Sequence, residues 1–263
     1  MNDLILDFHN VTKRYGTKRS GTQTAVDNAT FSLERGRIYG FVGENGAGKT
    51  TCIRMMCGLS EPDEGKIELF GTKCCNGDAK TIAALRRKIG SLVEQPVLNP
   101  FVTARENLIE RYILFGTYSG SLDSHITEIL ERTGLGDTGK KKVRDFSLGM
   151  RQRLGIALAL ITNPELLILD EPMNGLDPMG MISIRHLIQS LCRDDGITVL
   201  ISSHILSELE ELATDYIFIS HGKILKTART EEVCVKGKSL EDFYMEILGV
   251  TETGTITSGG LNA

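Results

Sequence analysis

The sequence contains the stretch Gly43-Glu44-Asn45-Gly46-Ala47-Gly48-Lys49-Thr50-Thr51, which lies between an apolar run ending at Val42 and a predicted helix over 49–56. Its spacing is that of a phosphate-binding loop, G-x-x-x-x-G-K-[ST]. In such a loop the backbone N–H groups surround the phosphates, the lysine reaches the β and γ oxygens, and the helix N-terminus adds its positive dipole end. A glycine-rich turn without a ligand is the alternative, and the coincidence of strand, complete motif and helix argues against it. The stretch therefore predicts a nucleoside triphosphate site with Lys49 as a catalytic cation.

An acidic pair, Asp170-Glu171, follows the apolar run 166–169, which is typical of a buried parallel strand. Asp170 can hold the water shell of Mg²⁺, and Thr50 has the position of a hydroxyl ligand to the same ion. Glu171 stands where the chain leaves the sheet, and it is the candidate for polarising the attacking water. Acidic pairs are common on surfaces, so a solvated strand end would be the simpler interpretation without the phosphate-binding loop.

A third motif reads Phe146-Ser147-Leu148-Gly149-Met150-Arg151-Gln152-Arg153 and opens a predicted helix. Together with the loop and the acidic pair, it resembles the ATP-binding cassette family, the motor subunits of ABC transporters, over nearly the whole chain. The resemblance implies an α/β fold, in which a P-loop NTPase core with a mostly parallel sheet carries an N-terminal antiparallel β subdomain and an inserted helical subdomain at about 95–155. We expect one such ATPase domain over 1–250 and a flexible tail over 251–263, which is rich in Thr, Gly and Ser.

The resemblance also implies roles for single residues. Tyr15 matches the aromatic residue that stacks on adenine, which favours ATP over GTP, and His204 matches the catalytic switch histidine that senses the γ-phosphate. Ser147 and Gly149 match the signature residues that bind the γ-phosphate held by the opposite subunit. Asp177 matches the loop that contacts that subunit. These residues imply ATP and Mg²⁺ as the cofactors, held between two cassettes.

Two features depart from the family pattern. The signature has a second glycine where this chain has Leu148, and a Gln or Glu where it has Met150. Leucine adopts φ > 0 less easily than glycine, which predicts a less permissive backbone. The glutamine that links the metal site to the membrane subunit aligns best with Glu94, and Gln95 is the next residue, so either is a candidate for this coupling loop and for the metal. Both departures resemble bacterial exporters of the bacitracin and lantibiotic self-protection type.

Length and composition limit the possible functions. With 263 residues and a single phosphate-binding loop, the chain is predicted to supply one half of a two-cassette ATPase. The net charge of −4 gives no support for a nucleic-acid surface, because such binders usually show a strongly basic face. The six cysteines form no C-x-x-C pair, so no zinc or redox motif is expected. We expect no signal peptide and no membrane span, and hence a cytoplasmic protein that reaches the inner face of the cell membrane through its permease.

Periodicity and turn residues predict the order of the elements, and the alternation of strand and helix after residue 166 indicates a parallel α/β sheet. The apolar stripe of the last helix is expected to pack on the core. The predicted elements are short strands near 4–42, a strand over 66–70, a helix after the capping box Thr103-x-x-Glu106, a helix over 122–130, strands over 166–169 and 199–201 that each precede a helix, a hairpin over 216–225, and a helix that begins at Ser239.

These expectations combine into one functional hypothesis. Two copies of this chain, or this chain and a similar one, would trap MgATP between one phosphate-binding loop and the opposite signature, and hydrolysis would reopen them. This cycle would drive a separate polytopic membrane permease that exports peptide antibiotics or similar compounds. Two alternatives stay open, a soluble cassette ATPase that acts on ribosomes or DNA and a nucleotide-gated regulatory protein with little turnover. The first class usually carries two cassettes or a long coiled-coil insert, which this sequence does not contain. The retention of Lys49, Asp170 and Glu171 argues against the second.

Overall fold

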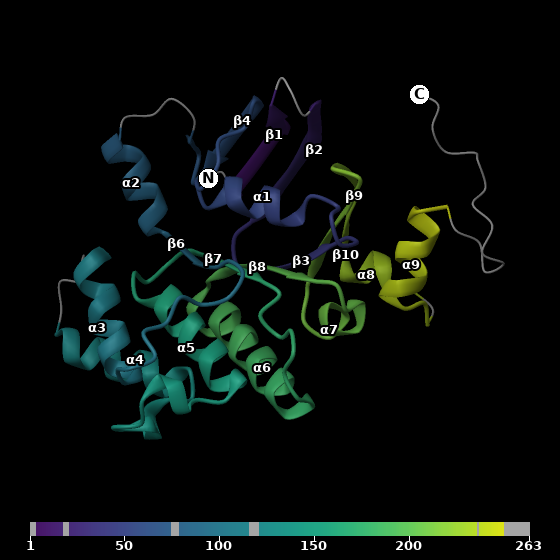
Figure 1. Ribbon diagram of the computed structural model, residues 1–263. Coiled ribbons are helices and arrows are strands. Elements are labelled where there is room, and N and C mark those ends of the chain that lie inside the picture. The colour runs from purple at the N-terminus through teal and green to yellow at the C-terminus, as the bar shows by residue number, and fades with distance from the viewer. Residues whose placement is uncertain (1–3, 18–20, 75–78, 116–120, 236, 250–263) are drawn as a thin grey trace.

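The computed structural model describes residues 4–17, 21–74, 79–115, 121–235 and 237–249, and Figure 1 shows how they are arranged. One sheet is antiparallel and has the strand order β2-β1-β4-β5. Its strands are β1 (Leu4–Thr17), β2 (Gly21–Glu34), β4 (Glu64–Leu69) and β5 (Thr72–Lys73).

The other sheet has the order β10-β9-β3-β8-β7-β6 and is parallel except for β10, which pairs antiparallel with β9. Val42 lies opposite Ser203, and Asp170 lies opposite Ser202, so β3, β8 and β7 end at the same edge of the sheet. Its strands are β3 (Ile38–Val42), β6 (Ile89–Leu92), β7 (Leu166–Asp170), β8 (Thr198–Ser203), β9 (Asp215–Ser220) and β10 (Lys223–Arg229).

Helices cover both faces of this second sheet. Figure 1 shows α1 on the side of the antiparallel sheet and α5, α6 and α7 on the opposite side, while α3 and α4 lie beyond the β6 edge. The helices are α1 (Lys49–Met56), α2 (Ala79–Arg87), α3 (Ala104–Phe115), α4 (Leu122–Arg132), α5 (Leu148–Leu160), α6 (Pro178–Asp195), α7 (Leu206–Glu210), α8 (Thr230–Val233) and α9 (Leu240–Ile247).

Burial explains the strand composition. The strands β3, β7, β8 and β9 are buried along their whole length, as expected for apolar strands that are covered on both faces. One apolar cluster lies between this sheet and α6, a second lies between the two sheets around α1, and a third joins α3, α4 and α5. Within the described part of the chain, the structure has no helix of sufficient length and apolarity to cross a membrane.

The predicted fold class is confirmed, and so are most of the predicted elements. The capping box forms as expected, because Thr103 N donates to Glu106 Oε2 (2.7 Å) and Glu106 N donates to Thr103 Oγ1 (3.2 Å). A second capping box joins Ser239 and Asp242 at the start of α9, whose apolar side chains pack on the core.

The prediction of short strands near the N-terminus is wrong, because β1 and β2 each run for 14 residues. Register shifts along their pairing interrupt the alternation of apolar and polar residues, so a long bulged strand has the sequence pattern of several short ones. The helix predicted after the strand over 199–201 is short, since α7 spans only Leu206–Glu210. The tail over 251–263 lies outside the described residues.

Candidate functional site

The phosphate-binding loop connects β3 to α1 and packs closely on neighbouring backbone. A Cβ atom on Gly43 would come within 2.4 Å of Ile219 O, and one on Gly48, where φ is +109°, would come within 2.6 Å of Ala25 O. Both positions therefore require glycine. Gly222 N donates to Ala47 O (2.8 Å), which fixes the loop against the β9–β10 turn.

Lys49 begins α1 and is only 6% exposed. Its Nζ donates to two carbonyls of its own loop, Gly43 O (2.5 Å) and Glu44 O (3.1 Å). Burial lowers the pKa of Lys49, although the carboxylates of Glu171 and Asp170 oppose the shift. An anion bound in the loop would add a charge that stabilises the ammonium form.

Asp170 ends β7 at the same edge of the sheet and is 8% exposed. Its Oδ1 accepts from Ser202 Oγ (2.5 Å), and its Oδ2 accepts from Thr50 Oγ1 (3.4 Å). Burial raises the pKa of Asp170, while the bond from Ser202 opposes this shift. Thr50 and Asp170 thus bring a hydroxyl and a carboxylate oxygen together beside the loop.

This pair of oxygens fits Mg²⁺. The described residues contain no group of three or more His, Cys, Asp or Glu side chains that could bind a metal ion. Mg²⁺ does not need such a group, because it usually binds through one or two protein oxygens together with water and substrate phosphates. Thr50 and Asp170 match that requirement in chemistry and in position.

Glu171 follows in a left-handed backbone conformation, with φ of +49°. Its N–H donates to Ser202 O and Ser202 Oγ (both 3.1 Å), which directs the chain away from the sheet. Its Oε2 lies 3.1 Å from His204 Nδ1 and accepts from Asn174 Nδ2 (3.3 Å). The structure therefore brings the predicted base and the predicted switch histidine into direct contact across β7 and β8.

A cavity of about 620 Å³ opens beside these groups. Five of the predicted site residues, Gln95 among them, line it together with residues of the signature segment. The principal lining residues are Thr50, Glu94, Gln95, Leu148, Arg151, Gln152, Asp170, Glu171, Asn174 and Gly175. We call this space the nucleotide cleft.

Tyr15 lies on β1 and is 43% exposed, with Lys13 Nζ 5.7 Å from the centroid of its ring. Ser147 and Asp177 are also exposed, and each caps a helix. Ser147 Oγ accepts from Met150 N (3.3 Å) at the start of α5, and Asp177 Oδ1 accepts from Gly180 N (2.8 Å) at the start of α6. These two residues thus have a structural role within the chain.

Leu148 behaves differently from the expectation. It is the first residue of α5 and does not adopt a positive φ, so the restricted backbone predicted for leucine does not arise. Its side chain lies against the loop before α6, since a Cβ atom on Gly175 would come within 3.2 Å of Leu148 Cδ2. Leucine is therefore compatible with the signature conformation.

Two contributors to the site were not predicted. Ser202 Oγ donates to Asp170 Oδ1 and accepts from the backbone N–H of Glu171. The only sequence signal for this role was a hydroxyl residue at the end of the strand next to β7.

The second contributor is Arg54 on α1, whose Nη2 lies 2.5 Å from Glu94 Oε1. A contact between residues 40 positions apart has no local sequence signal.

This combination of loop, helix and acidic strand end defines a P-loop protein that binds a nucleoside triphosphate. The family model described as ABC transporter matches residues 26–174, and the chain belongs to this family. It is therefore an ATP-binding protein of the ATP-hydrolysing cassette class.

Curated relatives are similar over most of their length. The bacitracin transport ATP-binding protein BcrA of Bacillus licheniformis is 45% identical over 87% of this chain and 72% of its own length. The lantibiotic transport ATP-binding protein SrtF of Streptococcus pyogenes is 41% identical over 84% of this chain and 89% of its own length. The dimeric post-hydrolysis structure of the ATP-binding cassette MJ0796, bound to ADP and Pi, superposes with a TM-score of 0.77 at 26% identity, over 86% of this chain and 98% of that one.

Proposed function

We propose that this chain is the ATP-binding and ATP-hydrolysing subunit of a bacterial exporter of peptide antibiotics or similar compounds. It would work as a nucleotide-sandwich dimer on a separate polytopic membrane permease, at the cytoplasmic face of the cell membrane. The observation that carries the proposal is the contact of Glu171 with His204 beside the Thr50–Asp170 pair. The substrate class is inferred from the names of the relatives, which concern bacitracin and lantibiotic transport.

Nucleotide binding would use the loop and the end of the β1–β2 hairpin. The backbone N–H groups of residues 43–51 and the Lys49 ammonium face the phosphates in this proposal. Tyr15 would stack on adenine, and its exposed ring is free of the core packing that would prevent this. Thr50 and Asp170, with Glu94 or Gln95, would hold Mg²⁺, which when bound neutralises charge on the phosphate oxygens.

Hydrolysis would depend on Glu171. Its carboxylate would orient a water molecule toward the γ-phosphorus and accept its proton as the new P–O bond forms and the bond from the γ-phosphorus to the bridging oxygen of ADP breaks. His204 and Asn174 both contact Oε2, which leaves Oε1 available to the water. His204 would thereby fix the direction of the Glu171 side chain, which the left-handed backbone already turns out of the sheet.

The second half of the site would come from a partner cassette. Gly149 supports this, because an added Cβ atom there would approach Leu176 Cδ2 only to 3.7 Å, an ordinary contact. The packing around Gly149 would therefore accommodate a larger residue. Glycine also weakens a helix by about 1 kcal/mol relative to alanine, so its presence here needs another explanation. Close approach of a phosphate bound to the opposite loop would explain the glycine at position 149. Ser147 and Asp177, which are both exposed, would be available to the same partner.

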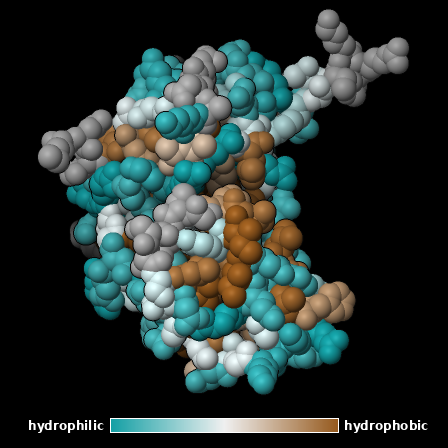
Figure 2. Space-filling model, turned by 90° about the vertical axis from the view of Figure 1, so that its left-hand side faces the viewer, coloured by the Kyte–Doolittle hydropathy of each residue, from teal (hydrophilic) through white to brown (hydrophobic). Residues whose placement is uncertain are grey.

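The permease would dock on the face formed by α2 and α3. Figure 2 shows apolar residues gathered in the middle of this face. A groove of about 450 Å³ runs between α2, α3 and the end of α5, with Ile82, Leu114 and Leu158 among its lining residues. Leu114 is 75% exposed, which is unusual for a large apolar side chain with no partner to cover it.

Affinity purification from membranes tests this proposal. The tagged full chain would be expressed in its host, extracted in mild detergent and analysed for proteins that accompany it in stoichiometric amounts. We expect a polytopic membrane protein, and we expect Leu114→Asp to lose it while MgATP binding is unchanged. Recovery of the wild-type chain with ribosomal or DNA-bound partners, or with no partner, would contradict the transporter assignment.

A further inference from the structure

We propose that Arg54 is a positioning residue for Glu94, which it neutralises and holds at the rim of the nucleotide cleft. The inference rests on the proposed function, since it concerns the same site. It assigns a role to a residue that belongs to none of the motifs described above.

Arg54 is close to the residues proposed to hold Mg²⁺. Arg54 follows Thr50 by four residues on α1, so the two side chains lie on the same face of the helix. Glu94 lines the nucleotide cleft together with Thr50 and Asp170. The 2.5 Å contact between Arg54 Nη2 and Glu94 Oε1 therefore connects α1 to the loop after β6 beside the metal ligands.

The nucleotide cleft has an excess of negative charge. Asp170, Glu171 and Glu94 bring carboxylates to the cleft, where a negatively charged triphosphate must bind. Glu94 aligns best with the neutral glutamine of the family pattern, and its carboxylate adds a negative charge to the cleft. Repulsion between like charges rises as water is excluded, and the guanidinium of Arg54 offsets the charge of Glu94.

The backbone of Glu94 is in an unusual conformation. Glu94 has φ of +63°, a left-handed conformation that non-glycine residues adopt rarely. Such conformations persist where surrounding interactions determine them, and they gather at functional sites. The ion pair to α1 is an interaction that fixes the direction of this side chain.

The pair is not expected to matter for stability. Arg54 and Glu94 side chains are 47% and 61% exposed, and exposed ion pairs contribute little to the free energy of unfolding. The proposal therefore predicts an effect on nucleotide binding without an effect on the melting temperature. A purely structural pair would show the reverse.

A double-mutant cycle in the full chain tests the proposal. The variants are Arg54→Met, Glu94→Gln and the double variant, and the dissociation constant of ATP is measured calorimetrically with Mg²⁺ and again with EDTA. We expect Arg54→Met to weaken binding about three- to tenfold when residue 94 is Glu, and less than about twofold when it is Gln. Arg54→Lys should keep near wild-type affinity, because it keeps the charge.

Arg105→Met is the matched control, since Arg105 forms a similar exposed pair with Asp123 (2.6 Å) on α3 and α4. We expect no change in affinity from it. Equal effects of Arg54→Met in both backgrounds, or no effect in either, would overturn the role of Arg54 toward Glu94. Failure of the wild-type chain to bind MgATP would instead overturn the proposed function.

Discussion

At the scale of single residues, the site depends on groups that are buried at some cost to the fold. Asp170 is the clearest case, because burial raises the pKa of its carboxyl while Ser202 and Thr50 compensate only in part. A carboxyl whose pKa is raised in the folded state binds protons more tightly when folded than when unfolded. Its contribution therefore favours folding at low pH and is lost as the pH rises through the raised pKa.

This leads to a prediction for Asp170→Asn. At pH 7 and without nucleotide, the free energy of unfolding of the variant should be higher than that of wild type, because a buried charge is removed. The difference should shrink as the pH is lowered and the native carboxyl becomes protonated. Urea denaturation of both proteins between pH 4 and 7 (about one-unit steps) measures it. A variant less stable than wild type at pH 7 would show that the charge of Asp170 stabilises the fold.

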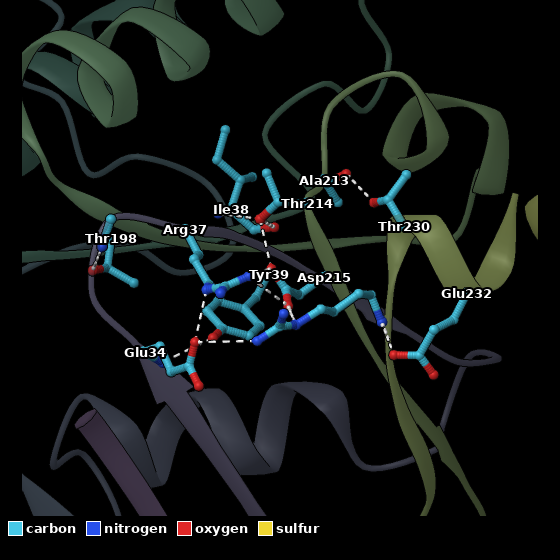
Figure 3. A network of polar contacts seen from close by, with 12 residues as sticks. Glu34, Arg37, Ile38, Tyr39, Thr198, Ala213, Thr214, Asp215, Thr230 and Glu232 are labelled. Atoms are coloured by element: carbon cyan, nitrogen blue, oxygen red, sulfur yellow. Dashed lines mark hydrogen bonds and ion pairs between the residues drawn. The ribbon is translucent and has the colours of Figure 1, made fainter. Parts of the chain in front are cut away.

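At the scale of elements, an ion-pair network ties the two sheets together at the edge opposite the nucleotide cleft. Figure 3 shows Arg37, which precedes β3, between Glu34 at the end of β2 and Asp215 at the start of β9. The distances are 2.8 Å from Arg37 Nε to Glu34 Oε2 and 3.2 Å from Nη1 to Asp215 Oδ2. Thr214 Oγ1 also donates to Asp215 Oδ2 (2.7 Å).

Arg37→Met should therefore lower the free energy of unfolding by about 1–3 kcal/mol, because it leaves the buried carboxylate of Asp215 with weaker partners. MgATP affinity should change less than about twofold, since β3 separates Arg37 from the phosphate-binding loop. Arg193→Met, which removes only an exposed pair between neighbours, is the control. An unchanged midpoint of urea denaturation would contradict the role of the network.

Features with a local sequence signal could be predicted. The strand and helix around the phosphate-binding loop, the capping box at Thr103, the helix start at Ser239 and the buried strand before Asp170 are each encoded within a few residues. Prediction failed for β1 and β2, whose bulges break the alternation, and α2 was not predicted. The pairings of Ser202 with Asp170 and of Arg54 with Glu94 join distant segments, so they depend on strand order and helix placement that no local pattern contains.

At the scale of the whole molecule, one cassette presents an incomplete site. The start of α6 lies next to the nucleotide cleft and is exposed, and the side chain of Met179 there is 72% exposed. A large apolar side chain in that position is expected to be covered by a second cassette. Two phosphate-bound loops and two signatures would then close on each other, and closure would depend on ATP.

Met179→Asp should therefore keep MgATP binding in the isolated chain and lose ATP-dependent dimerisation. Light scattering after gel filtration, in a Glu171→Gln background that retains ATP, measures the mass with and without nucleotide. Met245→Asp is the matched control, because Met245 is also exposed but lies on α9. A Met179→Asp variant that dimerises as well as its parent would place the interface elsewhere.

The most direct test of the central claim is turnover in the Glu171→Gln variant. The claim is that the cleft hydrolyses ATP with Glu171 as the base, held by His204 and Asn174. Phosphate release from MgATP under single-turnover conditions should fall by about 10²- to 10⁴-fold, with the dissociation constant of MgATP changed less than about threefold. Release at the wild-type rate, with binding intact, would contradict the account.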